Sequence, residues 1–133
     1  MRIDGACHCG AITYEAEIDP AGVRLCHCTD CQTLSGSAFR VTVSAADGSF
    51  ALLSGQPKIY IKTAESGNKR AQAFCADCGS TIYASAATDP QFYSLRVGGI
   101  DQRAQLPPQR QIWWQSAVEW SQNLQHLPRT ERQ

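Results

Sequence analysis

The stretch Cys26-His27-Cys28-Thr29-Asp30-Cys31 holds three cysteines within six residues, and two pairs flank it, Cys7-His8-Cys9 and Cys75-Ala76-Asp77-Cys78. Tetrahedral zinc is held by up to four thiolates, and cysteines one or two residues apart can place both sulfurs on one ion. Seven cysteines divide naturally as four plus three. The pattern predicts one closed zinc site with four sulfurs and a second site with three sulfurs and an open position.

Other uses of the cysteines are less consistent with this pattern. An odd count leaves at least one thiol outside any set of disulfides, and a Cys-x-Cys disulfide would close a badly strained loop. The segment 1–6 lacks the apolar stretch of a secretory signal, so we expect a reducing, cytoplasmic compartment. Four thiolates could also hold an iron–sulfur cluster, but pairs flanked by strands favour zinc.

The two outer pairs are the predicted ligands of a structural zinc: Cys7, Cys9, Cys75 and Cys78. Gly79 can adopt the positive φ that lets backbone amides point at sulfur. The ion would join chain segments separated by the 65 residues 10–74, which restricts the unfolded chain. In an alternative pairing, the middle group supplies one ligand and another cysteine stays free.

The middle group, Cys26, Cys28 and Cys31, is the predicted second zinc site and the candidate catalytic centre. In an extended Cys-His-Cys segment the histidine points away from both sulfurs, so we expect His27, and likewise His8, to pack or hydrogen-bond instead. Three sulfur ligands make zinc a weak Lewis acid toward water and a better partner for a soft ligand. The site therefore favours thiol chemistry over hydrolysis.

The composition indicates one domain with no charged partner. With 133 residues the chain is long enough for a single core. Twelve basic side chains balance twelve acidic ones, which gives no electrostatic case for nucleic acid or an anionic membrane. No apolar run approaches a membrane span. We expect one domain over residues 1–127 and a polar tail over 128–133.

Short strands separated by turn residues dominate the rest of the chain. One helical turn is expected at 29–34, capped by Thr29 or Asp30 and closed by Ser35-Gly36. The polar segment 63–69 is typical of a hairpin tip or loop. Strands are expected at 11–17, 23–26, 38–43, 50–53, 58–62, 70–74, 81–84 and 92–97. The pattern predicts a mainly β, zinc-stabilised domain with at most a short helix or two.

Together these motifs resemble the GFA family, the glutathione-dependent formaldehyde-activating enzymes. The resemblance rests on the stretches Gly5-Ala6-Cys7-His8-Cys9-Gly10, 26–32, 36–39, 74–80 and 112–120. It implies a β-tent-like fold of several curled antiparallel sheets, with zinc on the same four and the same three cysteines. It also implies carbon–sulfur lyase activity that joins formaldehyde and glutathione, or the reverse. Two positions depart from the family pattern: Gln111 stands where relatives often have His, and Glu119 where they often have Pro.

On this hypothesis a substrate thiol binds as a thiolate at the open position of the second zinc, and its sulfur attacks a small aldehyde. Candidate anchors for glutathione carboxylates are Arg24, Arg40, Lys69 and Arg70, although each also fits a solvated surface charge. Trp113, Trp114 and Trp120 are expected to cover the core rather than to line a pocket. Two alternatives remain: a non-catalytic zinc-stabilised binding module, and a family enzyme that uses another thiol or electrophile.

Overall fold

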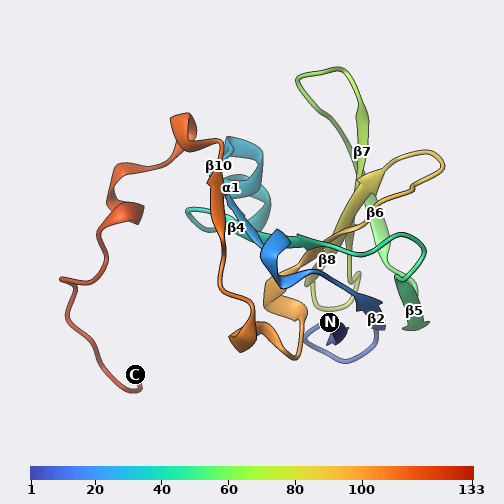
Figure 1. The fold of residues 1–133 in the computed structure, drawn as a ribbon, viewed down its shortest axis with the longest axis horizontal. Helices are drawn as coiled ribbons and strands as arrows, with labels where there is room; N and C mark the ends of the chain where they lie inside the picture. Colours follow the sequence, from blue (N-terminus) through green and yellow to red (C-terminus); the bar gives the residue numbers. More distant parts are fainter.

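A computed structural model describes residues 1–133 as two β-sheets with a single α-helix (Figure 1). The smaller sheet has the order β1-β2-β5, and the larger has the order β10-β3-β4-β9-β8-β7-β6. The strands are β1 (Arg2–Ala6), β2 (Thr13–Glu17), β3 (Arg24–Cys26), β4 (Arg40–Ser44), β5 (Ala51–Ser54), β6 (Lys58–Thr63), β7 (Lys69–Phe74), β8 (Thr81–Ala86), β9 (Ser94–Arg96) and β10 (Arg110–Ile112). The helix α1 spans Thr29–Ser35, and 3₁₀ turns lie at Pro20–Gly22, Val97–Gly99, Arg103–Gln105, Trp114–Ser116 and Glu119–Gln122.

The core forms where strands present alternate apolar side chains. In β2, Tyr14 and Ala16 are buried while Glu17 is exposed, as the two-residue period of a strand requires. A cluster of four aromatic rings extends this core: the centroid of Phe50 lies 5.8 Å from that of Tyr14, 5.2 Å from that of Tyr83 and 4.6 Å from that of Tyr93. Cys7 and Cys75 belong to the same buried cluster.

The prediction of a mainly β domain with short helices is confirmed, and a structural strand overlaps each of the eight predicted ranges. Two strands were missed, β1 and β10. β1 has one large apolar residue, Ile3, and an interior glycine, so its sequence carries little strand signal. β10 is three residues long and mostly polar, and it pairs parallel to β3 whereas all other pairs are antiparallel.

The predicted cap of α1 is wrong by one residue or two. The N-cap is Cys28, whose Sγ accepts the Cys31 N–H at 3.2 Å, and not Thr29 or Asp30. Gly36 ends the helix in the left-handed conformation, with φ of 64°, as expected at this position.

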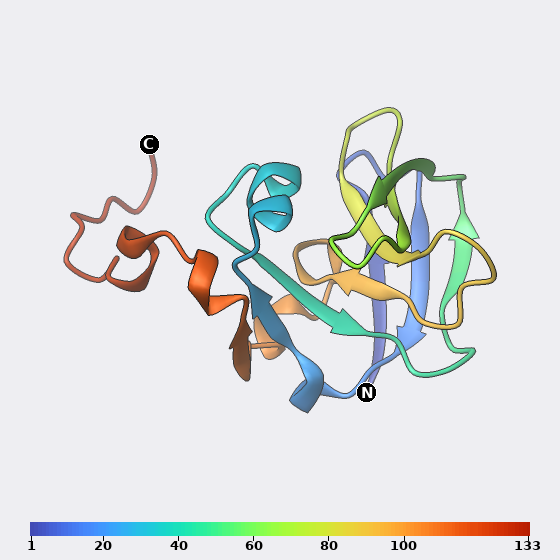
Figure 2. The ribbon, with the colours of Figure 1, turned by 90° about the horizontal axis from the view of Figure 1, so that it is seen from above.

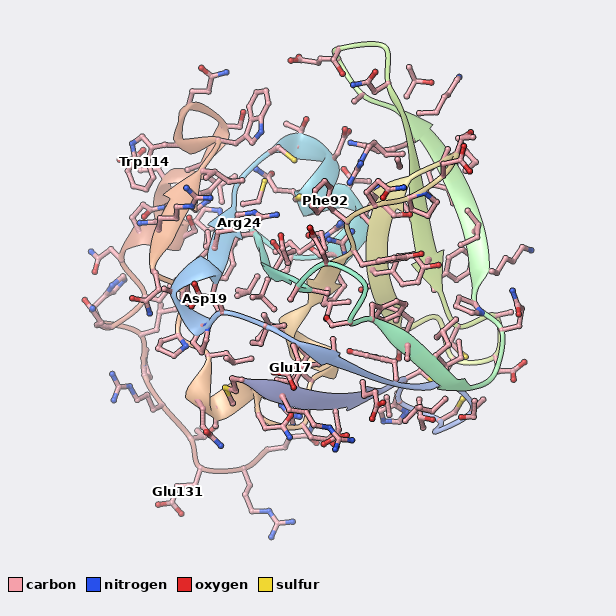
Figure 3. The ribbon with its side chains drawn as sticks, turned by 45° about the vertical axis from the view of Figure 1, so that its right-hand side comes forward. Glu17, Asp19, Arg24, Phe92, Trp114 and Glu131 are labelled. Carbon is pink, nitrogen blue, oxygen red and sulfur yellow. The ribbon has the colours of Figure 1, made fainter.

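The C-terminal segment leads away from the sheets (Figure 2). Trp113, Trp114 and Trp120 are 45%, 56% and 63% exposed, so the expectation that they cover the core is wrong. Figure 3 places Trp114 at the periphery and Glu131 far along this segment. No helix in the chain has both the length and the apolar character needed to span a membrane.

The ring of Tyr14 on β2 packs closely over Gly5 on β1. This glycine pairs directly with Tyr14, and a Cβ atom on Gly5 would lie 2.2 Å from Cζ of that buried ring. The ring covers the glycine across the strand pair. We predict that Gly5→Ala lowers the free energy of unfolding by about 1–3 kcal/mol, because the ring must shift. Urea denaturation followed by tyrosine and tryptophan fluorescence measures the change.

Gly98→Ala is the matched control, because a Cβ atom there meets nothing within 4 Å. A change below about 0.5 kcal/mol is expected for it. Equal stability of the two variants would contradict the packing described for Gly5.

Candidate metal centres

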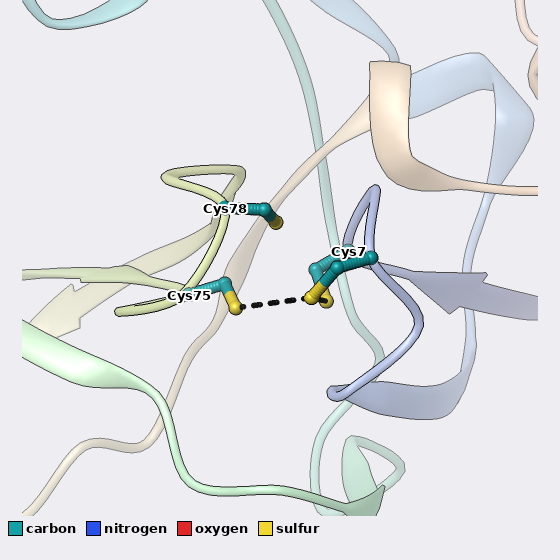
Figure 4. Close-up of side chains that lie close together, drawn as sticks. Cys7, Cys75 and Cys78 are labelled. Carbon is teal, nitrogen blue, oxygen red and sulfur yellow. Dashed lines mark hydrogen bonds between the residues drawn. The ribbon is translucent and has the colours of Figure 1, made fainter.

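The first centre joins the end of β1 to the turn between β7 and β8. Cys7 and Cys9 lie on the loop after β1, while Cys75 and Cys78 lie on the facing turn, with the sulfurs pointing toward one another (Figure 4). Cys7 Sγ lies 3.6 Å from Cys9 Sγ, which lies 3.8 Å from Cys75 Sγ. All four sulfurs lie within 4.8 Å of one another.

Two glycines shape the loops that present these sulfurs. Gly10 and Gly79 each follow the second cysteine of a pair, with φ of 81° and 77°. Their N–H groups donate to the carbonyls of Cys7 at 3.0 Å and Cys75 at 2.8 Å, closing both turns. Such left-handed positions favour glycine, which explains the Cys-Gly sequence in both loops.

Hydrogen bonds to sulfur favour the thiolate form of Cys7 and Cys78 in this centre. The Ile12 N–H donates to Cys7 Sγ at 3.2 Å. The Ser80 hydroxyl lies 3.2 Å from Cys78 Sγ and also accepts the His8 N–H at 2.9 Å. The Ser80 side chain and backbone N–H lower the pKa of the Cys78 thiol to about 5.

This donor set fits zinc. Tetrahedral zinc with Zn–S bonds of about 2.3 Å requires sulfur–sulfur separations of about 3.8 Å. The separations of 3.6 and 3.8 Å match that requirement. Four soft sulfurs, two of them buried, are a donor set that suits zinc and does not suit a hard cation.

The second centre is formed by one short stretch of the chain, residues 26–31. Cys26 ends β3, Cys28 caps α1, and Cys31 lies in its first turn. Their sulfurs also lie within 4.8 Å of one another, and no other cysteine, histidine or carboxylate joins the group. A hydrogen bond from the Cys31 thiol, opposed by burial, lowers the pKa of the Cys26 thiol to about 5, with smaller contributions from Cys28 and the charge of Arg40.

His27 lies outside this group, as expected from its direction in the chain. It is 1% exposed, its Nε2 lies 2.7 Å from Gln111 Oε1, and its ring makes edge contacts with Phe39 and Trp114. The His27 carbonyl accepts from Gln32 Nε2 at 2.7 Å. His27 therefore fixes the cysteine loop against β10 and α1.

A cavity of about 480 Å³ adjoins the three-cysteine centre, and Cys28 and Cys31 are among the residues that line it. Arg24, Arg40 and Arg70 line it as well, whereas Lys69 does not. Figure 3 shows Arg24 on β3 beside α1. Arg40 is 7% exposed, so its interpretation as a solvated surface charge is wrong.

Arg96 was not among the residues predicted from the sequence; it lies on β9 and is also 7% exposed. The sequence signal that could have indicated its burial was its place beside Leu95, in a short strand between Tyr93 and the pair Gly98-Gly99. A charged residue next to such an apolar residue is usually assigned to the solvent face.

The sequence model of the family described as "Glutathione-dependent formaldehyde-activating enzyme" matches residues 2–116. The chain belongs to the GFA family. A relative from Halomonas elongata, named "Putative glutathione-dependent formaldehyde-activating enzyme", is 25% identical over 115 residues, which cover 83% of this chain and 73% of the relative. A crystal structure of a Rhodobacter sphaeroides protein has a TM-score of 0.60 at 21% identity, covers 81% of this chain and 98% of its own, and shows the same fold.

In this GFA-family chain, the fold brings together the two cysteine groups that the spacing predicts. The alternative pairing, in which the middle group completes the first centre, has no counterpart in the structure.

The two centres predict different consequences of losing a ligand. Cys75→Ser removes a buried sulfur that joins distant segments, so we expect loss of one zinc and of cooperative unfolding. Structural zinc contributes about 10–16 kcal/mol in small domains, as much as the whole stability of a typical one. Cys28→Ser is expected to lose one zinc and keep a cooperative transition. Metal analysis and thermal denaturation of both variants measure the difference. Equal melting behaviour would contradict the division into a structural and a local centre.

Proposed function

We propose that the protein is a zinc-dependent carbon–sulfur lyase that joins a glutathione-like thiol and a small aldehyde such as formaldehyde, or cleaves their S-hydroxymethyl adduct. The observation that carries this proposal is the three-cysteine centre without a fourth protein ligand beside a cavity. Membership of the GFA family and the name of the Halomonas elongata relative support the choice of substrates.

Cys26, Cys28 and Cys31 would hold the catalytic zinc, and Cys7, Cys9, Cys75 and Cys78 the structural one. When bound by three sulfurs, zinc supplies a position that favours a fourth, external sulfur in its thiolate form near neutral pH. The protein orients this position through the Cys28 cap and through His27, which fixes the loop from behind.

The reaction is an addition in which all atoms are retained. The substrate thiol gives up its proton, and its sulfur lone pair forms a bond to the aldehyde carbon. The carbon–oxygen π electrons move to oxygen, which takes up a proton and becomes the hydroxyl of the adduct. Thiols add to formaldehyde unaided, so the protein contributes mainly by holding both reactants in one cavity, which can be worth several kcal/mol.

Exchange spectroscopy by NMR tests the activity at equilibrium. We predict that protein with two zinc ions accelerates exchange between free formaldehyde and its glutathione adduct above the uncatalysed rate. Cys28→Ser, which keeps the structural centre, is expected to return exchange to the uncatalysed rate. Native protein with full metal content and no acceleration would contradict the enzyme proposal and favour a zinc-stabilised binding module. Acceleration with a different thiol from a panel would assign another substrate.

A further inference from the structure

The larger sheet carries two buried positive charges that have no negative partner. Arg40 of β4 and Arg96 of β9 are each 7% exposed, and neither takes part in an ion pair. A guanidinium carries five N–H donors. The pair makes two hydrogen bonds, both to Gln72 Oε1, at 3.4 Å from Arg40 and 2.8 Å from Arg96. Nε and one terminal nitrogen of Arg40, and Nε of Arg96, are buried without any partner.

The sheet places the three side chains on one face. Thr42 of β4 pairs with Arg96, and Arg40, two residues before Thr42, lies on the same face. On β8 the residue between β9 and β7 is Ala84, which pairs with Ser94 on one side and with Gln72 on the other. This small side chain lets Gln72 reach the guanidinium groups, so the arrangement is held by paired strands rather than by loops.

Burial of this pair is costly. The pKa of Arg96 falls to about 9, because of burial first and of the charge of Arg40 second, so Arg96 is still protonated at neutral pH. A buried charge without a partner destabilises a fold. The arrangement is therefore expected of a site that binds an anion, where the missing partner comes with the ligand.

A count of the charges around the cavity shows whether the zinc centre alone could supply the negative partner of Arg40 and Arg96. Five cationic side chains and two carboxylates line the cavity, an excess of three positive charges. Zinc held by three thiolates carries one net negative charge, which leaves two positive charges unbalanced. Asp30, one of the two carboxylates, already pairs with Lys62. An external anion would balance the rest.

We propose that Arg40 and Arg96, aligned by Gln72, bind a carboxylate of the thiol substrate while its sulfur occupies the open position of the three-cysteine centre. This inference rests on the proposed function. Paired guanidinium groups match the planar carboxylate in two-point hydrogen bonding. The volume of about 480 Å³ lies within the range of small-molecule sites. The substrate class is therefore an acidic thiol, and a neutral thiol lacks the second contact.

Calorimetric titration of the two-zinc protein with glutathione, glutathione diethyl ester and S-methylglutathione tests the proposal. The ester keeps the thiol and lacks both carboxylates, whereas S-methylglutathione keeps the carboxylates and lacks the free thiol. We expect the ester to bind about 10- to 100-fold more weakly than glutathione, and Arg96→Gln to weaken glutathione binding by a similar factor without affecting the ester. Arg129→Gln on the exposed tail removes the same charge and is expected to change neither.

Thermal stability separates a binding role from a structural one. A site for an external anion predicts that ligand-free Arg96→Gln and Arg40→Gln melt at the same temperature as the native protein or higher, because a buried unpaired charge is removed. A clear fall in the melting temperature of both variants would overturn the proposal. Equal binding of glutathione and its ester would overturn it too and would leave the proposed function standing. Arginine-dependent binding of S-methylglutathione, together with no acceleration of formaldehyde–glutathione exchange by the native protein, would support the carboxylate site and refute the proposed function.

Discussion

Four cysteine sulfurs that converge from two loops are the constraint on which the rest of the structure depends. One loop follows β1 in the smaller sheet, and the other connects β7 to β8 in the larger sheet. A metal ion between them would join the two sheets directly. Because Cys7 and Cys75 are also members of the buried core, the ion would fix the position at which the two sheets pack.

The second centre depends on different forces. Its three cysteines lie within one β3–α1 connection, and the backbone holds that connection on two sides. β3 pairs with β4 and with β10, and the His27 N–H donates to the Ile112 carbonyl at 3.0 Å. Gln32 also reaches the carbonyl of Ser116 at 3.0 Å. The loop keeps its shape through protein hydrogen bonds, so its ligand position can stay open without loss of the fold.

The three cysteine motifs and most strands were predictable because each is visible in the local sequence, and the grouping of the two outer motifs followed from the four-sulfur limit of zinc. Spacing alone separated four sulfurs from three, and alternation located β2 and β4. The features that the sequence did not predict are those that only tertiary pairing creates. β10 is a strand because β3 offers it an edge, and Arg40 is buried because the face of β4 opposite Val41 and Val43 is covered as well. Similarly, nothing in the spacing of Trp113, Trp114 and Trp120 indicates that their segment leaves the core.

The wide separation of the outer cysteine pairs has a consequence for biosynthesis. A ribosome makes the chain from its N-terminus, so the three sulfurs of the middle group are complete once residue 31 has been added. Cys7 and Cys9 must wait until residue 78 emerges before their site can close. During this interval the nascent chain offers five thiolates and a single complete cluster to the cellular metal pool. The order of synthesis thus completes the ligand set of the middle group 47 residues before that of the outer pairs, residue 31 against residue 78.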